Sequence, residues 1–95
     1  MEEEMTIVPI DGNLDLHPFR PQDVAVVIPD YLRLCREQGL LQVRLIHGKG
    51  RGVRLRQVHA LLERLPGVVA FELATADAGG WGATWVQLRP CVEAK

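Results

Sequence analysis

The sequence predicts an α/β fold in which a mixed four-stranded sheet carries two helices, in the order β-α-β-α-β-β. Short β-rich segments alternate with two longer segments whose apolar side chains recur every three or four positions. Glycine and proline punctuate the connections between these segments. The chain has 95 residues, of which 47% are hydrophobic, so it can build one core but has no room for a second.

The first half of the chain is expected to form a strand, a helix and a second strand. Residues 13–17 alternate polar and apolar side chains, as a half-buried strand does. Residues 22–38 carry apolar side chains at helical spacing, which predicts an amphipathic helix. Pro29 lies inside that helix and removes one backbone hydrogen bond, so we expect a kink there. The apolar run at residues 42–46 predicts the second strand.

The second half is expected to add one helix and two strands. Residues 53–65 have a helical apolar stripe that Pro66-Gly67 ends. Residues 68–74 and 83–88 read as strands joined by a glycine-rich loop. Because two of the connections pass through helices, the first three strands should run parallel to one another. Two helices cover only one face of such a sheet, so the other face should be open.

Positive charge is concentrated in one stretch of an almost neutral chain. The formal net charge is −1, yet no acidic residue lies between Glu37 and Glu63. A patch of this kind favours binding to polyanions even when the whole protein is close to neutral. The basic residues in the interval are Arg44, Lys49, Arg51, Arg54 and Arg56.

The composition argues against secretion and against a membrane partner. No apolar run is long enough to cross a bilayer, and the acidic start of the chain is unlike a secretory signal. The two cysteines, Cys35 and Cys91, do not form a CxxC pair, so zinc and redox motifs are unsupported. We therefore expect a cytoplasmic protein.

The stretch His47-Gly48-Lys49-Gly50-Arg51-Gly52 is the most informative motif. A glycine-rich turn before a helix lets backbone N–H groups approach an anion, and the flanking basic side chains favour a phosphate. The stretch is neither a dinucleotide fingerprint nor a P-loop, because Val53 and Gly50 occupy positions that those motifs reserve for other residues. The predicted phosphate-binding residues are Gly48, Lys49, Gly50, Arg51, Gly52, Arg54 and Arg56.

Asp15, His17 and His47 are the candidate catalytic residues. Asp15 and His17 are two positions apart on a strand, so their side chains should project to the same side. If the first two strands are parallel neighbours, His17 and His47 both stand at carboxyl ends, where ligands of open α/β sheets bind. These groups suit acid–base cleavage of a phosphodiester bond, and they equally suit a divalent metal ion. The spacing leaves both alternatives open.

Two aromatic positions and a third histidine have less defined roles. His59 lies near the apolar stripe of the second helix and is expected to be a partly buried structural residue. Trp85 shares a strand face with Gln87 and is expected to pack across the sheet. Trp81 lies in the glycine-rich loop, where an exposed indole can stack on a base or anchor a protein partner.

Three segments together resemble the Smr (small MutS-related) domain family. They are residues 14–17 (LDLH), residues 46–52 (IHGKGRG) and residues 79–84 (GGWGAT), and their order and spacing match over most of the chain. The resemblance implies a two-layer α/β sandwich similar to the C-terminal domain of translation initiation factor three. The expected division is an N-terminal arm over residues 1–12, an Smr domain over 13–90 and a tail over 91–95.

The resemblance also implies roles for the motif residues. In the family, the acid and histidine that match Asp15 and His17 are implicated in cleavage, and the motif that matches His47 and its glycines is implicated in nucleic-acid contact and in catalysis. The third motif would shape the loop beside the site; its residues here are Gly79, Gly80, Trp81 and Gly82. One departure is that Pro18 follows His17, where many members have glycine.

The function that this resemblance implies is nucleic-acid cleavage. Smr domains are associated with endonucleases that nick DNA or cut RNA, some in a ribosome-linked setting. We therefore predict an endonuclease that acts on DNA or RNA by phosphodiester hydrolysis or transesterification. The alternative is a non-catalytic module that binds nucleic acid or the ribosome through the same basic loop. The sequence indicates no definite cofactor beyond the divalent metal ion considered above.

Overall fold

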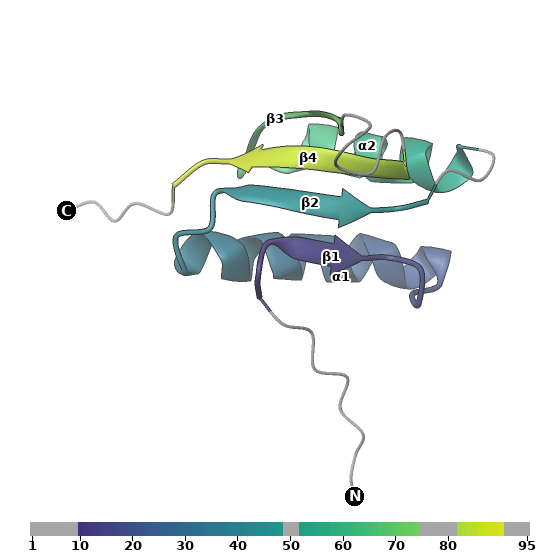
Figure 1. Ribbon diagram of the computed structural model, residues 1–95, viewed down its shortest axis with the longest axis horizontal. Coiled ribbons are helices and arrows are strands. Elements are labelled where there is room, and N and C mark those ends of the chain that lie inside the picture. Colours follow the sequence, from purple (N-terminus) through teal and green to yellow (C-terminus); the bar gives the residue numbers. More distant parts are fainter. Residues whose placement is uncertain (1–9, 49–51, 75–81, 91–95) are drawn as a thin grey trace, which may run out of the picture.

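The computed structural model describes residues 10–48, 52–74 and 82–90. It contains the predicted β-α-β-α-β-β order, with two helices and a mixed four-stranded sheet (Figure 1). The elements are β1 (Asn13–Asp15), α1 (Pro21–Glu37), β2 (Gln42–Ile46), α2 (Val53–Arg64), β3 (Val68–Leu73) and β4 (Ala83–Leu88).

The strands lie in the order β1-β2-β4-β3. β1 pairs in parallel with β2, whereas β4 runs antiparallel between β2 and β3. The first three strands therefore share one direction, as predicted, although β3 is bonded to β4 and not to β2. The parallel pairing of β1 and β2 brings the chain segments that follow Asp15 and Ile46 to the same edge of the sheet.

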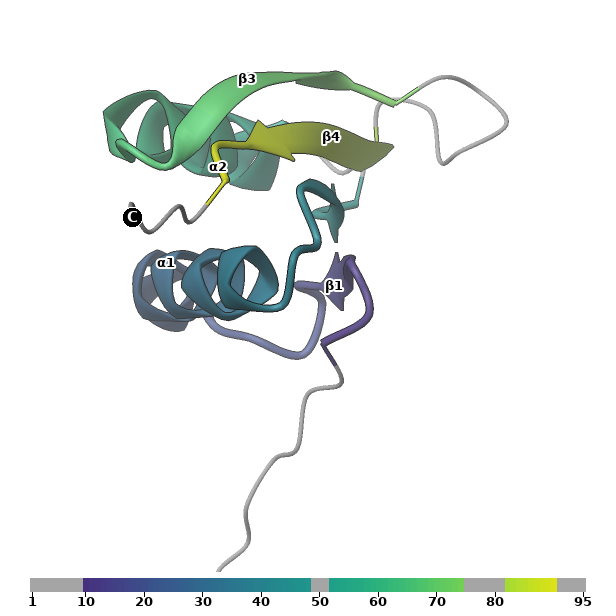
Figure 2. The same cartoon turned by 90° about the vertical axis from the view of Figure 1, so that its left-hand side faces the viewer.

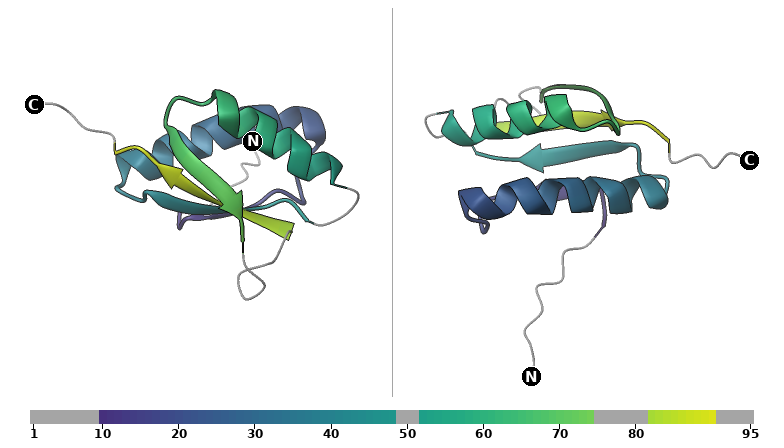
Figure 3. Two further views of the ribbon diagram at one scale, coloured as in Figure 1. Left: turned by 90° about the horizontal axis from the view of Figure 1, so that it is seen from above. Right: turned by 180° about the vertical axis from the view of Figure 1, so that it is seen from behind.

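Both helices cover one face of the sheet, and among the described elements none covers the other face, as predicted. Figure 2 shows α1 and α2 on one side of the strands, and the view from behind in Figure 3 shows the same layering. The core lies between these two layers; its buried side chains come from β1, β2, β4 and both helices, and Val68 and Phe71 of β3 pack against it partly buried. Its fully buried members include Leu14, Val24, Ile28, Val43, Leu45, Val58, Leu62, Val86 and Leu88.

β1 is two residues shorter than the predicted strand over residues 13–17. It ends at Asp15, although the Leu16 N–H still donates a 2.9 Å hydrogen bond to the Ile46 carbonyl. Pro18 has no N–H and cannot extend the ladder. The chain instead turns, and the Phe19 N–H donates to the Leu16 carbonyl at 3.0 Å.

The other element boundaries agree with the predicted ones to within one residue. α1 begins at Pro21, where a proline suits the first helical position because its missing N–H has no partner in the helix. Pro29 lies inside one continuous helix, so it does not divide α1 in two. In the parts of the chain that the structure describes, neither helix is long and apolar enough to span a membrane.

Val24 and Val26 give a direct test of which face of α1 supports the fold. Val24 is fully buried, whereas Val26 is 62% exposed on the same helix. Val24→Ala should lower the free energy of unfolding by about 2–3 kcal/mol, because it removes two methyl groups from the core. Val26→Ala should change it by less than about 0.5 kcal/mol. Urea denaturation measures both, and equal effects would contradict the assigned faces.

Candidate functional site

Asp15 and His17 form a hydrogen-bonded pair at the end of β1. The His17 Nδ1 lies 2.6 Å from the Asp15 Oδ1, which also accepts the backbone N–H of His17 at 3.0 Å. These two hydrogen bonds from His17 lower the pKa of Asp15 from its ordinary value of 3.8, so the carboxyl is ionised at neutral pH. A carboxylate only accepts, so the proton of a neutral His17 ring lies on Nδ1 and Nε2 keeps its lone pair.

The proline after His17 does not separate this pair. Pro18 and Phe19 form the turn that closes on the Leu16 carbonyl, and His17 stays beside Asp15 within it. The His17 side chain is 62% exposed, and that of Asp15 is 57% exposed. The departure from the family's glycine is therefore compatible with an accessible Asp15–His17 pair.

Gly48 brings the second motif against this pair, as the parallel pairing of the first two strands predicted. Its φ is +83°, in the left-handed region that favours glycine. A Cβ at this position would lie 2.9 Å from the His17 Nε2. Any larger residue would therefore push His17 away, and only glycine allows the imidazole to lie this close to the backbone.

The first two amides of the glycine motif point inward. The N–H groups of His47 and Gly48 both donate to the Gly82 carbonyl, at 3.0 and 2.8 Å. We expected the turn to offer its amides to an anion, but these two are already used to join β2 to the start of β4. Lys49, Gly50 and Arg51 lie outside the described residues, as do Gly79, Gly80 and Trp81.

His47 is buried behind Gly48, with 5% of its surface exposed. Its Nδ1 lies 3.0 Å from the Gly48 carbonyl, which only accepts, so Nδ1 carries the proton. Its Nε2 therefore accepts the hydroxyl proton of Thr84 at 2.8 Å. The Thr84 oxygen in turn accepts Nε2–H of His59 at 2.9 Å. The direction of each hydrogen bond in the series from His59 through Thr84 and His47 to Gly48 is thus fixed.

Burial lowers the pKa of both inner histidines and so favours their neutral form. Desolvation lowers the pKa of His47 from 6.5 against the opposing effect of the hydrogen bond to Gly48, and electrostatic interactions with Arg54 and His17 lower it further. Desolvation also lowers the pKa of His59. The electrostatic interaction with His47 lowers this pKa further, whereas that with Glu63 raises it. His59 is half-buried and packs on Phe71, with ring centroids 4.8 Å apart, as expected of a structural residue.

The three candidate catalytic residues are therefore neighbours with different surroundings. Asp15 and His17 are exposed and paired, whereas both ring nitrogens of His47 have partners inside the protein. Within the described ranges, no cluster of three or more His, Cys, Asp or Glu side chains could hold a metal ion. A metal site shared by Asp15, His17 and His47 is not supported by this geometry.

The described arginines differ in what they can offer a phosphate. Arg54 donates to the carbonyls of Leu16 and Phe19, at 2.9 and 3.2 Å, and so ties α2 to the turn after His17. Arg56 is exposed on the first turn of α2. That turn has no acidic residue, and its N-cap, Gly52, provides no side-chain cap. The N-terminus of α2 therefore carries uncompensated positive charge beside the glycine motif.

Thr84 is the functional-site residue that the sequence reasoning missed. It is fully buried and is hydrogen-bonded to both His47 and His59. The available signal was the alternation along residues 83–88, which places Thr84 on the inward side with Val86 and Leu88. A polar side chain on a buried strand face needs a partner, and the nearby histidines were the candidates.

The comparisons with known proteins agree with this arrangement of fold and motifs. The family model described as the Smr domain matches residues 14–89. The chain therefore belongs to the Smr domain family.

Relatives and solved structures place it more closely. The Endonuclease MutS2 of Halothermothrix orenii is 34% identical over 80 residues, which cover 84% of this chain and 10% of that protein. The crystal structure of the Smr domain of Thermus thermophilus MutS2 matches with a TM-score of 0.78 and 33% identity, covering 82% of this chain and 98% of that one. YdaL, a stand-alone small MutS-related protein from Escherichia coli, matches with a TM-score of 0.76 and 29% identity, covering 85% and 66%. The chain thus spans about a tenth of the length of the curated MutS2 relatives.

The buried histidines predict how stability depends on pH. Their pKa values are lowered by folding, so below pH 6.5 the unfolded chain binds protons that the folded chain does not. The free energy of unfolding should therefore be level above about pH 7. It should fall as the pH drops below 6.5, before the carboxyl groups titrate. Urea denaturation at a series of pH values measures this slope.

His59→Gln is the matched control for that slope. The glutamine amide can donate to Thr84 as the imidazole does, but it does not titrate in this range. The variant should lose part of the decline below pH 6.5 while keeping the level region. An unchanged slope in both His59→Gln and His47→Gln would contradict the assignment.

Proposed function

We propose that this chain is an Smr-domain endonuclease that cleaves a phosphodiester bond with His17 as the general base and Asp15 as the carboxylate that orients it. The observation that carries the proposal is the 2.6 Å contact between the Asp15 carboxylate and the Nδ1 of an exposed histidine. This contact orients the ring and leaves Nε2 as a base at the surface. Nε2 lies against Gly48, at the start of the basic glycine motif.

The chemistry needs one proton transfer from the nucleophile. Nε2 of His17 removes a proton from a water molecule, or from a ribose 2′-hydroxyl, as that oxygen forms a bond to phosphorus. The bond from phosphorus to the leaving oxygen breaks, and the leaving oxygen takes a proton from solvent. The ionised Asp15 stabilises the imidazolium that His17 becomes during this step.

The phosphate itself is proposed to bind on the glycine motif. Lys49 and Arg51 follow Gly48 in the sequence, and exposed Arg56 and the N-terminus of α2, which follows the motif, add positive charge. Arg54 supports this site from inside through its bonds to the turn after His17. The partner is DNA or RNA, because a repeated phosphate backbone best satisfies a patch of this kind.

The names of the relatives support the same reaction. The MutS2 proteins that match this chain are called endonucleases, and the solved Smr domain of another MutS2 has a similar structure. The alternative is a module that binds nucleic acid or the ribosome without cutting. That module would use the same glycine motif and would leave the Asp15–His17 pair without a chemical role.

His17→Ala tests the proposed reaction. Removing a general acid–base group typically slows a reaction by about 100- to 10,000-fold, so cleavage should fall by that factor. Binding should change little, because the phosphate contacts are on the glycine motif. Supercoiled plasmid and structured RNA, each with and without a chelator, are the substrates, and gel electrophoresis measures the products.

The control is Gln38→Ala, an exposed residue at the C-terminal end of α1, purified in the same way. It should cleave as the wild type does. Equal cleavage by His17→Ala and Gln38→Ala would overturn the assignment of the reaction to this pair. Salt-dependent binding without any cleavage by the wild type would instead establish the non-catalytic module.

A further inference from the structure

We propose that the open face of the sheet binds an unpaired base of single-stranded nucleic acid, with Trp85 as the stacking surface. The inference rests on the proposed function and specifies the substrate as a single strand or an unpaired region. It assigns a second contact area outside the Asp15–His17 pair and the glycine motif. Trp85 was expected only to pack across the sheet.

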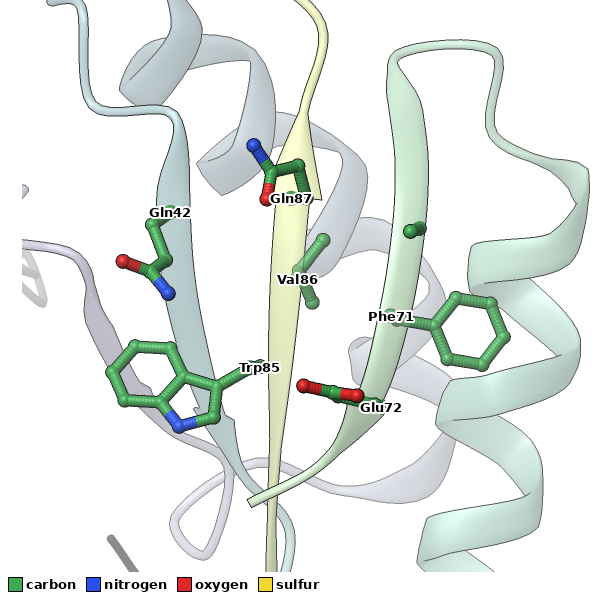
Figure 4. A pocket seen from close by; sticks show the side chains of 7 residues that line it. Gln42, Phe71, Glu72, Trp85, Val86 and Gln87 are labelled. Atoms are coloured by element: carbon green, nitrogen blue, oxygen red, sulfur yellow. The ribbon is translucent and has the colours of Figure 1, made fainter. Parts of the chain in front are cut away.

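A hollow of about 200 Å³ lies on this open face, between β2, β4 and β3. Figure 4 shows Gln42, Trp85, Glu72 and Gln87 around it, while Phe71 points away toward α2. The indole of Trp85 is only half-buried. An aromatic ring exposed on a sheet face is the arrangement on which several RNA-binding folds stack bases.

The strand register places polar side chains on both sides of the indole. Arg44 of β2 and Glu72 of β3 are the direct cross-strand partners of Trp85. Gln42 of β2 and Gln87 of β4 also pair with each other, two residues along the strands from the pair of Arg44 and Trp85. A flat apolar surface is thus bordered by groups that can hydrogen-bond to the edge of a base.

Three of these bordering side chains, those of Gln42, Glu72 and Gln87, are available for a ligand. Within the described chain, the side chains of Gln42, Glu72 and Gln87 make no hydrogen bond or ion pair. The two amides can each donate and accept, and the Glu72 carboxylate accepts from amino groups such as the cytosine N4. Among the described residues that line the hollow, Glu72 is the only charged one, and its carboxylate disfavours a phosphate there. The hollow therefore suits a neutral base and not the backbone.

Trp85 and Asp15 lie on the same face of the sheet, a short distance apart. Asp15 is on the exposed side of β1, and its cross-strand partner is Ile46 of β2. Trp85 is two strands away from Asp15, on β4, and is displaced by two residues along the strand. The usual spacings of a β-sheet put the two residues about 12 Å apart. The positive charge of Arg44 lies between them. A single strand can therefore stack a base on Trp85 and place a nearby phosphate at His17.

A base-paired duplex cannot use this contact, because its bases are already stacked and paired. The test is fluorescence anisotropy with a labelled 12-nucleotide single strand and with the matching duplex. Trp85→Ala should weaken single-strand binding by about 5- to 150-fold, the loss of one stacked base. It should leave duplex binding, which depends on phosphate contacts, unchanged. Trp85→Phe should retain much of the single-strand affinity.

Two further variants separate base contact from general damage. Gln42→Ala removes a group at the hollow, whereas Gln38→Ala removes the same side chain from the end of α1 on the other layer. Only the first should weaken single-strand binding. Thermal unfolding checks that each variant is folded. If Trp85→Ala is not folded, the single-strand affinity of Trp85→Phe is used in its place.

The outcomes distinguish this inference from the proposed function. Wild-type protein that binds both nucleic acids, with Trp85 variants that bind the single strand equally well, overturns the inference and leaves the function standing. Wild-type protein that binds neither nucleic acid overturns both. Trp85→Ala protein that changes from an oligomer to a monomer would assign this face to a second copy of the chain and would also overturn the inference.

Discussion

The buried imidazole of His47 is the constraint on which the arrangement of the site depends. One of its nitrogens holds the Gly48 carbonyl and the other holds the hydroxyl of Thr84, so it joins the end of β2 to β4. The two amides that donate to Gly82 fasten the same junction from the backbone. Gly48 is thereby fixed in its left-handed conformation, with the His17 ring against it. The buried His47 thus positions Gly48, which lies beside the exposed His17.

Two histidines at adjacent strand ends therefore have opposite physical characters. The His17 side chain is 62% exposed, and its Nδ1–H donates to the ionised Asp15 carboxylate. This hydrogen bond leaves the Nε2 lone pair free to accept a proton. His47 is 5% exposed, and each of its nitrogens is already occupied. Two arginines of α2 differ in the same way. Arg54 donates hydrogen bonds to the carbonyls of Leu16 and Phe19, whereas Arg56 is exposed. In the proposed function, Asp15 and His17 carry out the chemistry, while His47 and Arg54 position the segments around them.

The sequence predicted those features that depend on local pattern. The alternation over residues 13–17 placed Asp15 and His17 on one side, and the helical connection predicted parallel β1 and β2. It did not predict that β4 lies between β2 and β3, because strand order depends on packing and not on chain order. It also gave no partner for His47 or Arg54, since Thr84 is 37 residues from the first and Leu16 is 38 residues from the second. Contacts at such separations depend on the tertiary fold.

The tautomer of His47 is the most direct test of this account. Nitrogen-15 NMR of the imidazole side chains distinguishes a proton on Nδ1 from one on Nε2 and both from a charged ring. Spectra of His17→Gln and His59→Gln variants would assign the three histidines. The account predicts that at neutral pH His47 is uncharged and carries its proton on Nδ1. A charged ring, or a proton on Nε2, would contradict it.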